Sequence, residues 1–281
     1  LSGRWPQAVL HERGFSWPRV VGSVGDAETA VGVSAAGADE VYQRVFGQTE
    51  AGELSDGVRP LLPRTVLPHE APRLLETLDG GDVIVGNLGI LAAGSSRARI
   101  GADSGLNVVN AHSVAALEEL GAVSVWASPE LSGRQLAELA SSSPLPVGCL
   151  VWGRVELMVA EQCVLQAAGT CTRRCASCDR RRGWWRLRDQ EGYEFPVITD
   201  ISGRAHIMNA VTLDLTRALD EIIEAGVGAV RIDLSDESPA RAAEIVGSLA
   251  QAVRSVAAGE PCPQHPLVEP STSGHFYRGL L

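Results

Sequence analysis

Four of the six cysteines crowd into one short segment, as Cys163, Cys171, Cys175 and Cys178. Thiolates at this density are typical of a bound metal ion or metal cluster. Zinc sites commonly use two separated CxxC pairs, whereas this segment has only one. The irregular spacing favours an iron–sulfur cluster, a 4Fe–4S cubane, because its corners lie farther apart than the ligands of one ion. Zinc stays open as an alternative, as do unmetallated cysteines or a redox pair.

The composition narrows the remaining chemistry. The 281-residue chain has a net charge of −10, and every basic residue is arginine. The absence of lysine excludes Schiff-base chemistry and a P-loop of the usual kind. No apolar stretch reaches the roughly 20 residues of a membrane span, and clustered thiols in a long chain indicate a reducing compartment. We therefore expect a cytoplasmic protein with no membrane span.

Alternating apolar runs and helical segments must position these residues. Eight runs are expected to be strands: residues 18–24, 40–45, 58–64, 82–87, 99–102, 123–127, 147–152 and 229–234. Helices are expected over residues 26–36, 69–78, 113–120, 132–141, 213–225 and 239–257. Eight strands alternating with helices predict an α/β fold, a closed (β/α)8 barrel of the TIM type. The whole chain, 1–281, is then one barrel domain.

The alternation of strands and helices is interrupted once, between the seventh and eighth strands. Residues 153–212 are expected to form a metal-binding insertion that holds the cysteines and short antiparallel strands at 184–189, 195–199 and 206–209. An insertion after the seventh strand would start at the catalytic rim. We therefore expect the thiols to lie near Glu130 and Arg154. Residues 261–281 are expected to wrap over the surface as a tail.

Polar residues follow the carboxyl ends of several expected strands, where barrel enzymes carry their active sites. The candidates for acid–base or anion-binding chemistry are Glu130, Asp103 and Arg154; the candidates for substrate binding are Asn87, Asn107, Ser128 and Glu156. Helix capping and loop hydrogen bonding are the alternative role for each of them. His112 and His206 are expected to be structural, and His275 to lie near the barrel mouth.

Arginines surround a pair of tryptophans in the insertion, with Trp184 and Arg186 at the centre of the run. Arginine beside stacking aromatics is a pattern of single-stranded RNA recognition, so both are candidate substrate-binding residues. The alternative is a solvated face beside a strand. The sequence contains neither of two common hydrolase motifs, the HExxH of metalloproteases and the GxSxG of serine hydrolases, so it gives little support for protease chemistry.

Taken in order, several stretches resemble peptidase family U32, the collagenase-like proteins. They include Gly37 to Tyr42, Gly86 to Gly89, Ala102 to Asn110, Ser128 to Leu131, Gly153 to Val159, the cysteines, Leu187 to Asp189, Phe195 to Val197, and Gly274 to Gly279. The sequence is most similar to the second barrel of long members that carry two barrels. A preceding barrel or a second family member is therefore an expected partner.

The resemblance implies a barrel with a cysteine-bearing insertion. Better characterised members are iron–sulfur enzymes that hydroxylate RNA bases or a small aromatic quinone precursor. That activity is the expectation for this chain. Proteolysis, as the family label says, and a zinc-stapled binding module without catalysis are the alternatives. Some relatives take one cluster ligand from elsewhere in the chain, whereas all four cysteines here are local.

Overall fold

The computed structural model describes residues 18–45, 54–78, 81–94, 96–263, 265 and 267–279. The expected barrel domain of residues 1–281 begins with residues 1–17, and the expected tail ends with residues 280–281; both of these stretches lie outside the described residues. Among the described residues, no helix is long and apolar enough to pass through a bilayer.

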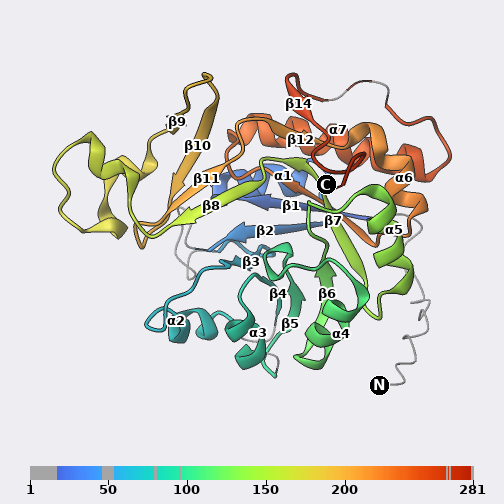
Figure 1. Cartoon of the computed structure of the whole chain (residues 1–281), viewed down its shortest axis with the longest axis horizontal. Coiled ribbons are helices and arrows are strands. Elements are labelled where there is room, and N and C mark those ends of the chain that lie inside the picture. Colours follow the sequence, from blue (N-terminus) through green and yellow to red (C-terminus); the bar gives the residue numbers. More distant parts are fainter. Residues whose placement is uncertain are drawn as a thin grey trace.

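Eight parallel strands close into the predicted barrel (Figure 1). They are β1 (Arg19–Val24), β2 (Glu40–Arg44), β3 (Arg59–Leu62), β4 (Asp82–Val85), β5 (Arg99–Ala102), β6 (Ala122–Trp126), β7 (Val147–Gly153) and β13 (Ala229–Asp233). The barrel closes because β13 pairs in parallel with both β7 and β1, with Ala229 opposite Gly148 on one side and Arg19 on the other.

Helices follow most of the strands and cover the outside of the barrel. They are α1 (Ala27–Ala35), α2 (Ala71–Glu76), α3 (Leu88–Gly94), α4 (Ala111–Glu119), α5 (Gly133–Ser142), α6 (Leu219–Glu224) and α7 (Pro239–Ala257). Side-chain caps start several of them: Asp26 accepts from the Thr29 amide, and Ser238 from the Arg241 amide. Such caps satisfy amides that a helix N-terminus leaves unpaired.

Each barrel strand divides its side chains between two environments. Outward residues such as Val20, Val230 and Ile232 join the main core beneath the helices. The alternate positions form a second cluster inside the barrel, made of Val21, Tyr42, Leu61, Ile84, Trp126 and Ala229. This interior cluster fills the barrel below its mouth, so the site can be built only at the strand ends.

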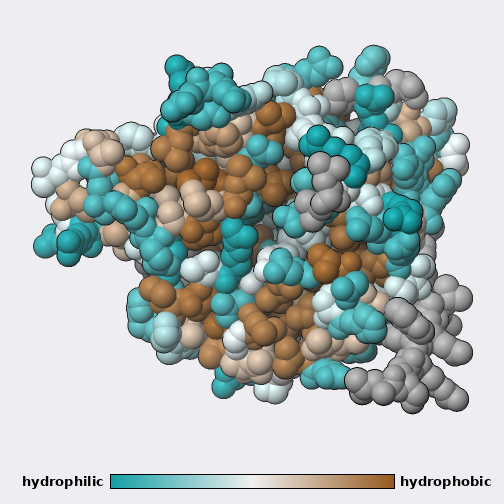
Figure 2. Space-filling model, viewed as in Figure 1, coloured by the Kyte–Doolittle hydropathy of each residue, from teal (hydrophilic) through white to brown (hydrophobic). Residues whose placement is uncertain are grey.

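A separate antiparallel sheet stands beside the mouth, in the order β8-β11-β10-β9. Its strands are β8 (Glu156–Ala160), β9 (Trp185–Arg188), β10 (Glu194–Thr199) and β11 (Ala205–Met208). The expected antiparallel insertion is thereby confirmed, with β8 as a strand that the sequence did not reveal. The cysteine segment, residues 163–178, lies in the connection from β8 to β9. On the surface, hydrophobic side chains gather over the small sheet (Figure 2).

The predicted helix over residues 213–225 is wrong at its start. Residues Thr212–Asp214 form β12, which pairs antiparallel with β7, and the helix α6 begins only at Leu219. Asp214 causes the change, because its Oδ1 accepts from the Thr216 amide at 2.9 Å and turns the chain. In the tail, β14 (Ser271–Thr272) pairs with β12.

Candidate functional site

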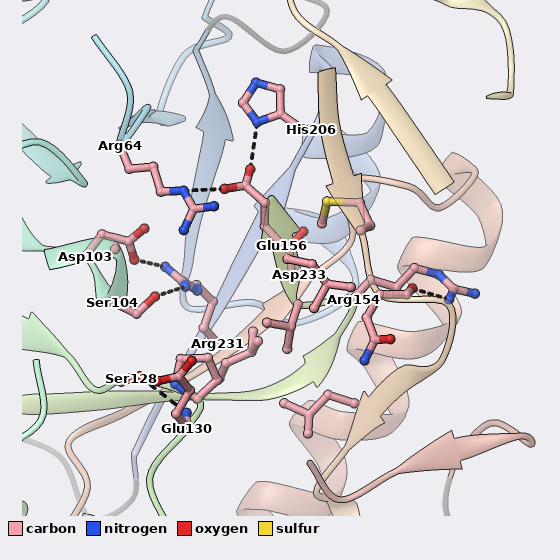
Figure 3. A pocket seen from close by; sticks show the side chains of 18 of the residues that line it. Arg64, Asp103, Ser104, Ser128, Glu130, Arg154, Glu156, His206, Arg231 and Asp233 are labelled. Atoms are coloured by element: carbon pink, nitrogen blue, oxygen red, sulfur yellow. Dashed lines mark hydrogen bonds and ion pairs between the residues drawn. The ribbon is translucent and has the colours of Figure 1, made fainter. Parts of the chain in front are cut away.

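A cavity of about 400 Å³ opens at the carboxyl ends of the barrel strands (Figure 3). Its walls come from the ends of β2, β3, β5, β6, β7 and β13, from the small sheet, and from the tail. Seven residues predicted from the sequence lie within or beside this cavity. Those that line it are Asp103, Asn107, Ser128, Glu130, Arg154 and Glu156, together with His275 of the tail.

The deepest cations of the cavity are paired with carboxylates. Arg231 of β13, 6 % exposed in its side chain, donates to Asp103 at 2.6 Å and lies 5.0 Å from the centre of the Trp126 ring. Arg44 of β2 pairs with the buried Asp233. Within each pair the positive and negative charges cancel, and both pairs are largely buried. The cavity floor is therefore polar without a strong net charge.

Arg154 is held in place by the protein itself. Its Nε lies 2.8 Å from Asp236, and its Nη1 donates to the carbonyls of Asn209 and Ala210. Burial raises the pKa of Asp236, and the charge of Asp233 raises it further, while Arg154 opposes both. The structure thus gives Arg154 a role in fixing the loop after β7, in addition to lining the cavity.

Glu130 differs from the other acids of the cavity. Its backbone amide donates to Ser128 Oγ at 3.3 Å, while its carboxylate has no hydrogen-bond or ion-pair partner among the described residues. Asp103 and Glu156 both have cationic partners. An exposed, uncommitted carboxylate at the mouth can accept or deliver a proton to a ligand, so Glu130 is the strongest acid–base candidate.

The other predicted substrate-binding residues have different positions. Asn87 caps α3, where its Oδ1 accepts from the amides of Gly89 and Ile90 at 3.0 and 3.2 Å. Trp184 is 72 % exposed, and Arg186 is paired with Glu194 at 2.8 Å on the small sheet. None of the three is among the residues that line the described cavity. For Asn87 the structure shows the capping role.

His206, expected to be structural, lines the cavity and connects two carboxylates. Its Nδ1 lies 2.7 Å from Glu156 Oε2, and its Nε2 lies 3.5 Å from Asp200 Oδ2. Burial alone would lower the pKa of His206, but the bonds to Asp200 and Glu156 outweigh it and raise the pKa. Burial likewise disfavours the Glu156 anion, yet His206, Arg44 and Arg64 together lower the pKa of that carboxyl.

The four clustered cysteines all lie in the segment between β8 and β9. All are free thiols, and the amide of Arg173 donates to Cys171 Sγ at 3.4 Å. Burial raises the pKa of Cys175, and the charges of the other three thiols, then of Asp200, raise it further. Four thiols are by their chemistry the donor set of a zinc or iron–sulfur site. Within the described part of the chain, no three His, Cys, Asp or Glu side chains are grouped closely enough to hold a single ion.

The thiols do not adjoin Glu130 and Arg154, as the position of the insertion had led us to expect. In Figure 1 the cysteine segment lies at the outer end of the small sheet, and no cysteine of the segment lines the cavity. The segment packs against the turn between β10 and β11, where Gly203 lies next to Cys175. The same turn contains Asp200, whose charge acts on Cys175. The small sheet carries the segment outward, because β8 leaves the barrel immediately after the strand end at Gly153.

Sequence reasoning missed several residues of the cavity, including Arg44, Arg231 and Asp233. The sequence feature that could have revealed them is a charged residue inside an otherwise apolar strand, as in Val230-Arg231-Ile232-Asp233. A charged side chain in a buried strand is usually paired, but the pairing partner comes from another strand and depends on the barrel register. The tail also contributes more than a surface wrap, because Thr272, His275 and Arg278 line the cavity.

Comparison with known proteins adds the family. A search of curated proteins gave no match. A search of solved structures gave matches at low similarity, of which two are described here. One, described as the U32 peptidase Mk0906, is 13 % identical with a TM-score of 0.43 over 84 % of this chain and 100 % of that one. The other, the Bacillus megaterium spore cortex-lytic enzyme SleL, is 12 % identical with a TM-score of 0.38 over 82 % and 73 %.

The sequence pattern of a known family covers most of the described barrel. The match runs over residues 69–276, from the start of the second helical segment through the insertion to the tail. It includes the cysteines, the small sheet and most of the cavity wall. The ordered motifs in the sequence indicated the same assignment, and the chain belongs to peptidase family U32.

Proposed function

We propose that this protein is an iron–sulfur-dependent enzyme that hydroxylates an RNA base or a small aromatic compound such as a quinone precursor. The observation that carries the proposal is the pairing of two features in one fold: a polar cavity at the barrel mouth and a four-thiol site on the adjoining sheet. Cys163, Cys171, Cys175 and Cys178 would hold the cluster. Such a cluster supplies electron transfer or activation of an oxygen donor.

The cavity favours a small polar ring as ligand. Its volume of about 400 Å³ lies at the low end for small-molecule sites. The paired arginines of its floor leave no strong charge there for a polyanion, while Arg231 and Trp126 offer a polar and an aromatic surface. In this proposal Glu130 would exchange a proton with the ligand, and Ser128 and Asn107, which also line the cavity, would bind it.

The metal centre is tested by anaerobic purification of the full chain. We expect a brown protein with absorption near ~400 nm and about four irons per chain. Replacing all four cysteines by serine should abolish both. A colourless protein that stays free of iron after anaerobic reconstitution would refute the proposal, and stoichiometric zinc instead would favour the zinc-stapled module.

The activity is tested by mass spectrometry of total RNA and of quinones from a strain that lacks the gene. Loss of one hydroxylated species, restored by the wild-type gene, is expected. A gene encoding Glu130→Gln should restore it poorly, whereas Glu138→Gln, an exposed acid on α5, should restore it fully. An unchanged set of RNA and quinone species would count against hydroxylation.

Peptidase activity is the second candidate, favoured by membership of the U32 family. It predicts cleavage of a denatured collagen substrate that persists after loss of the four cysteines. Cleavage that maps to a cavity residue such as Glu130 would support it over hydroxylation.

A further inference from the structure

One face of the small sheet is turned to the barrel mouth. Ile198 of β10 lies opposite His206 of β11, and both line the cavity. His206 in turn lies opposite Val159 of β8. Side chains alternate between the two faces of a strand, and directly opposite residues share a face. These three residues therefore define one face, called here the mouth face, and the half-exposed Leu157 at the start of β8 lines the cavity beside them.

The cysteine segment covers the opposite face of the small sheet. Val197 and Ile207 of that face pack with Val164 of the segment. The Trp185 ring joins the same cluster and donates from its Nε1 to the Arg180 carbonyl at 2.7 Å, which holds the segment against the sheet. The cysteine segment and the cavity therefore lie on opposite faces.

The mouth face continues outward to two arginines of β9. Pro196, two residues before Ile198, lies opposite Arg186, so Arg186 is on the mouth face, and Arg188 is on it by alternation. Both arginines contact the single carboxylate of Glu194, so this group keeps a net positive charge. Their side chains are 58 and 70 % exposed. From Ile198 to Arg186 the path is one strand across and two residues along, roughly 8 Å between backbones.

An exposed aromatic residue adjoins these arginines. Trp184 directly precedes β9 and is 72 % exposed. It belongs to the most basic part of the chain, because seven arginines and one aspartate lie between residues 171 and 188, a net charge of +6 in a chain whose total is −10. An exposed indole beside arginines offers a stacking surface for a base and cations for a phosphate backbone. A small uncharged ligand of the cavity needs neither.

We propose that the mouth face binds a single-stranded RNA: one base occupies the cavity, flanking phosphates contact Arg186 and Arg188, and a neighbouring base stacks on Trp184. The inference rests on the proposed function and selects RNA from its two substrate classes. The cavity floor, whose charges cancel, suits an uncharged base, while the basic region outside it suits the backbone. The apolar Leu157 and Ile198 lie between these two parts, where a base or sugar can pack on them. An acidic protein segment would match the charge but would leave the cavity unused.

Fluorescence anisotropy of a labelled single-stranded RNA of about ten nucleotides tests this surface on the full chain. Loss of stacking in Trp184→Ala should weaken binding about 5- to 150-fold. Arg186→Gln combined with Arg188→Gln should lower the slope of log affinity against log salt concentration by about 1.4, because each phosphate contact contributes about 0.7. Two controls should bind as the wild type does: Leu187→Ala, on the opposite face of β9, and Arg134→Gln, an exposed arginine of α5.

Three results of this assay would overturn the inference. They are a wild-type chain that does not bind the RNA, equal affinity in the wild type and all variants, and stronger competition by polyglutamate or by DNA of the same sequence than by unlabelled RNA. Crosslinking of the wild-type chain gives a reading that does not depend on the folding of any variant. Thiouridine in the RNA should attach on irradiation to the peptide that contains residues 184–188, and attachment only elsewhere would also overturn the inference.

The binding assay and the test of the proposed function can fail separately. If a quinone species loses its hydroxyl group in the deletion strain but the chain does not bind RNA, then this inference is wrong and the proposed function stands. If RNA binds through Trp184 and the two arginines while the hydroxylated species are unchanged, then the surface is supported and the proposed hydroxylation is refuted.

Discussion

Gly203 allows a sharp test of how the small sheet supports the thiol site. It lies in the turn between β10 and β11 with a φ of +90°, and a Cβ atom at this position would lie 2.7 Å from Cys175 Sγ. Gly192 lies in the turn between β9 and β10 with the same φ of +90°, yet a Cβ there would meet nothing within 4 Å. The two alanine variants therefore share the backbone strain and differ in the sulfur contact.

The size of each effect follows from this geometry. An alanine held at positive φ costs about 1–2 kcal/mol in either turn. In Gly203→Ala the sulfur must also retreat by at least ~0.7 Å to reach ordinary van der Waals distance, which begins at 3.4 Å. Displacing the support of a metal ligand typically costs about 10- to 100-fold in metal affinity. We expect that loss in Gly203→Ala alone.

Two assays separate these effects. Urea unfolding of the metal-free chains should show similar destabilisation in both variants. If the thiols hold the proposed iron–sulfur cluster, release of its iron to a chelator, followed by the loss of absorption, should be faster in Gly203→Ala than in Gly192→Ala and the wild type. If both variants retain iron equally well, then Cys175 does not act as a ligand in the position that the structure gives it.

Three further outcomes follow from buried groups. Arg204→Met removes the cation that pairs with the buried Glu70 and one of the two side-chain partners of the buried Asp200, so unfolding in urea should show a loss of about 3–5 kcal/mol. Gly133→Ala places a Cβ 2.8 Å from the ring of Phe276, so overpacking should cost about 1–3 kcal/mol and expose the tail to trypsin. The raised pKa of His206 contributes stability that is complete below its ordinary pKa of about 6.5. Stability should fall as the pH rises through the higher folded pKa, and His206→Gln should lose this dependence.

Matched controls accompany these variants. Arg186→Met removes an exposed arginine paired with Glu194 and should cost less than ~1 kcal/mol. Gly32→Ala adds a Cβ at an ordinary 3.7 Å from its neighbour and should leave the tail protected. Equal losses in Arg204→Met and Arg186→Met would contradict the buried network. A trypsin pattern of Gly133→Ala identical to the wild type would show that Phe276 does not hold the tail.

The barrel could be predicted because its signals are local. Each strand is an apolar run between turn residues, and α7 begins and ends where Ser238, Pro239 and Gly259 indicate. The helix α3 escaped prediction because its small residues show no clear period. It forms because Asn87 caps it and because Ile90 and Leu91 pack into the core.

The site could be predicted only in part, for a reason of geometry. Strand ends identify Glu130, Asp103 and Ser128 without any pairing information, since all barrel strands end at one rim. That Asp103 meets Arg231, or that His206 meets Glu156, depends on register between segments far apart in the sequence. The position of the thiols depended in the same way on the pairing of β8 with β11.

The small separation of the four thiols in the chain affects how the protein folds. The cavity needs residues from Arg44 to Arg278, and the barrel closes only when Arg19 pairs with Ala229. The cysteines, in contrast, lie between residues 163 and 178, where loop closure is rapid. They would therefore capture the proposed metal before the barrel exists. A ligand bound by the unfolded chain stabilises the folded state less, so metal loading should change the melting of the barrel only modestly.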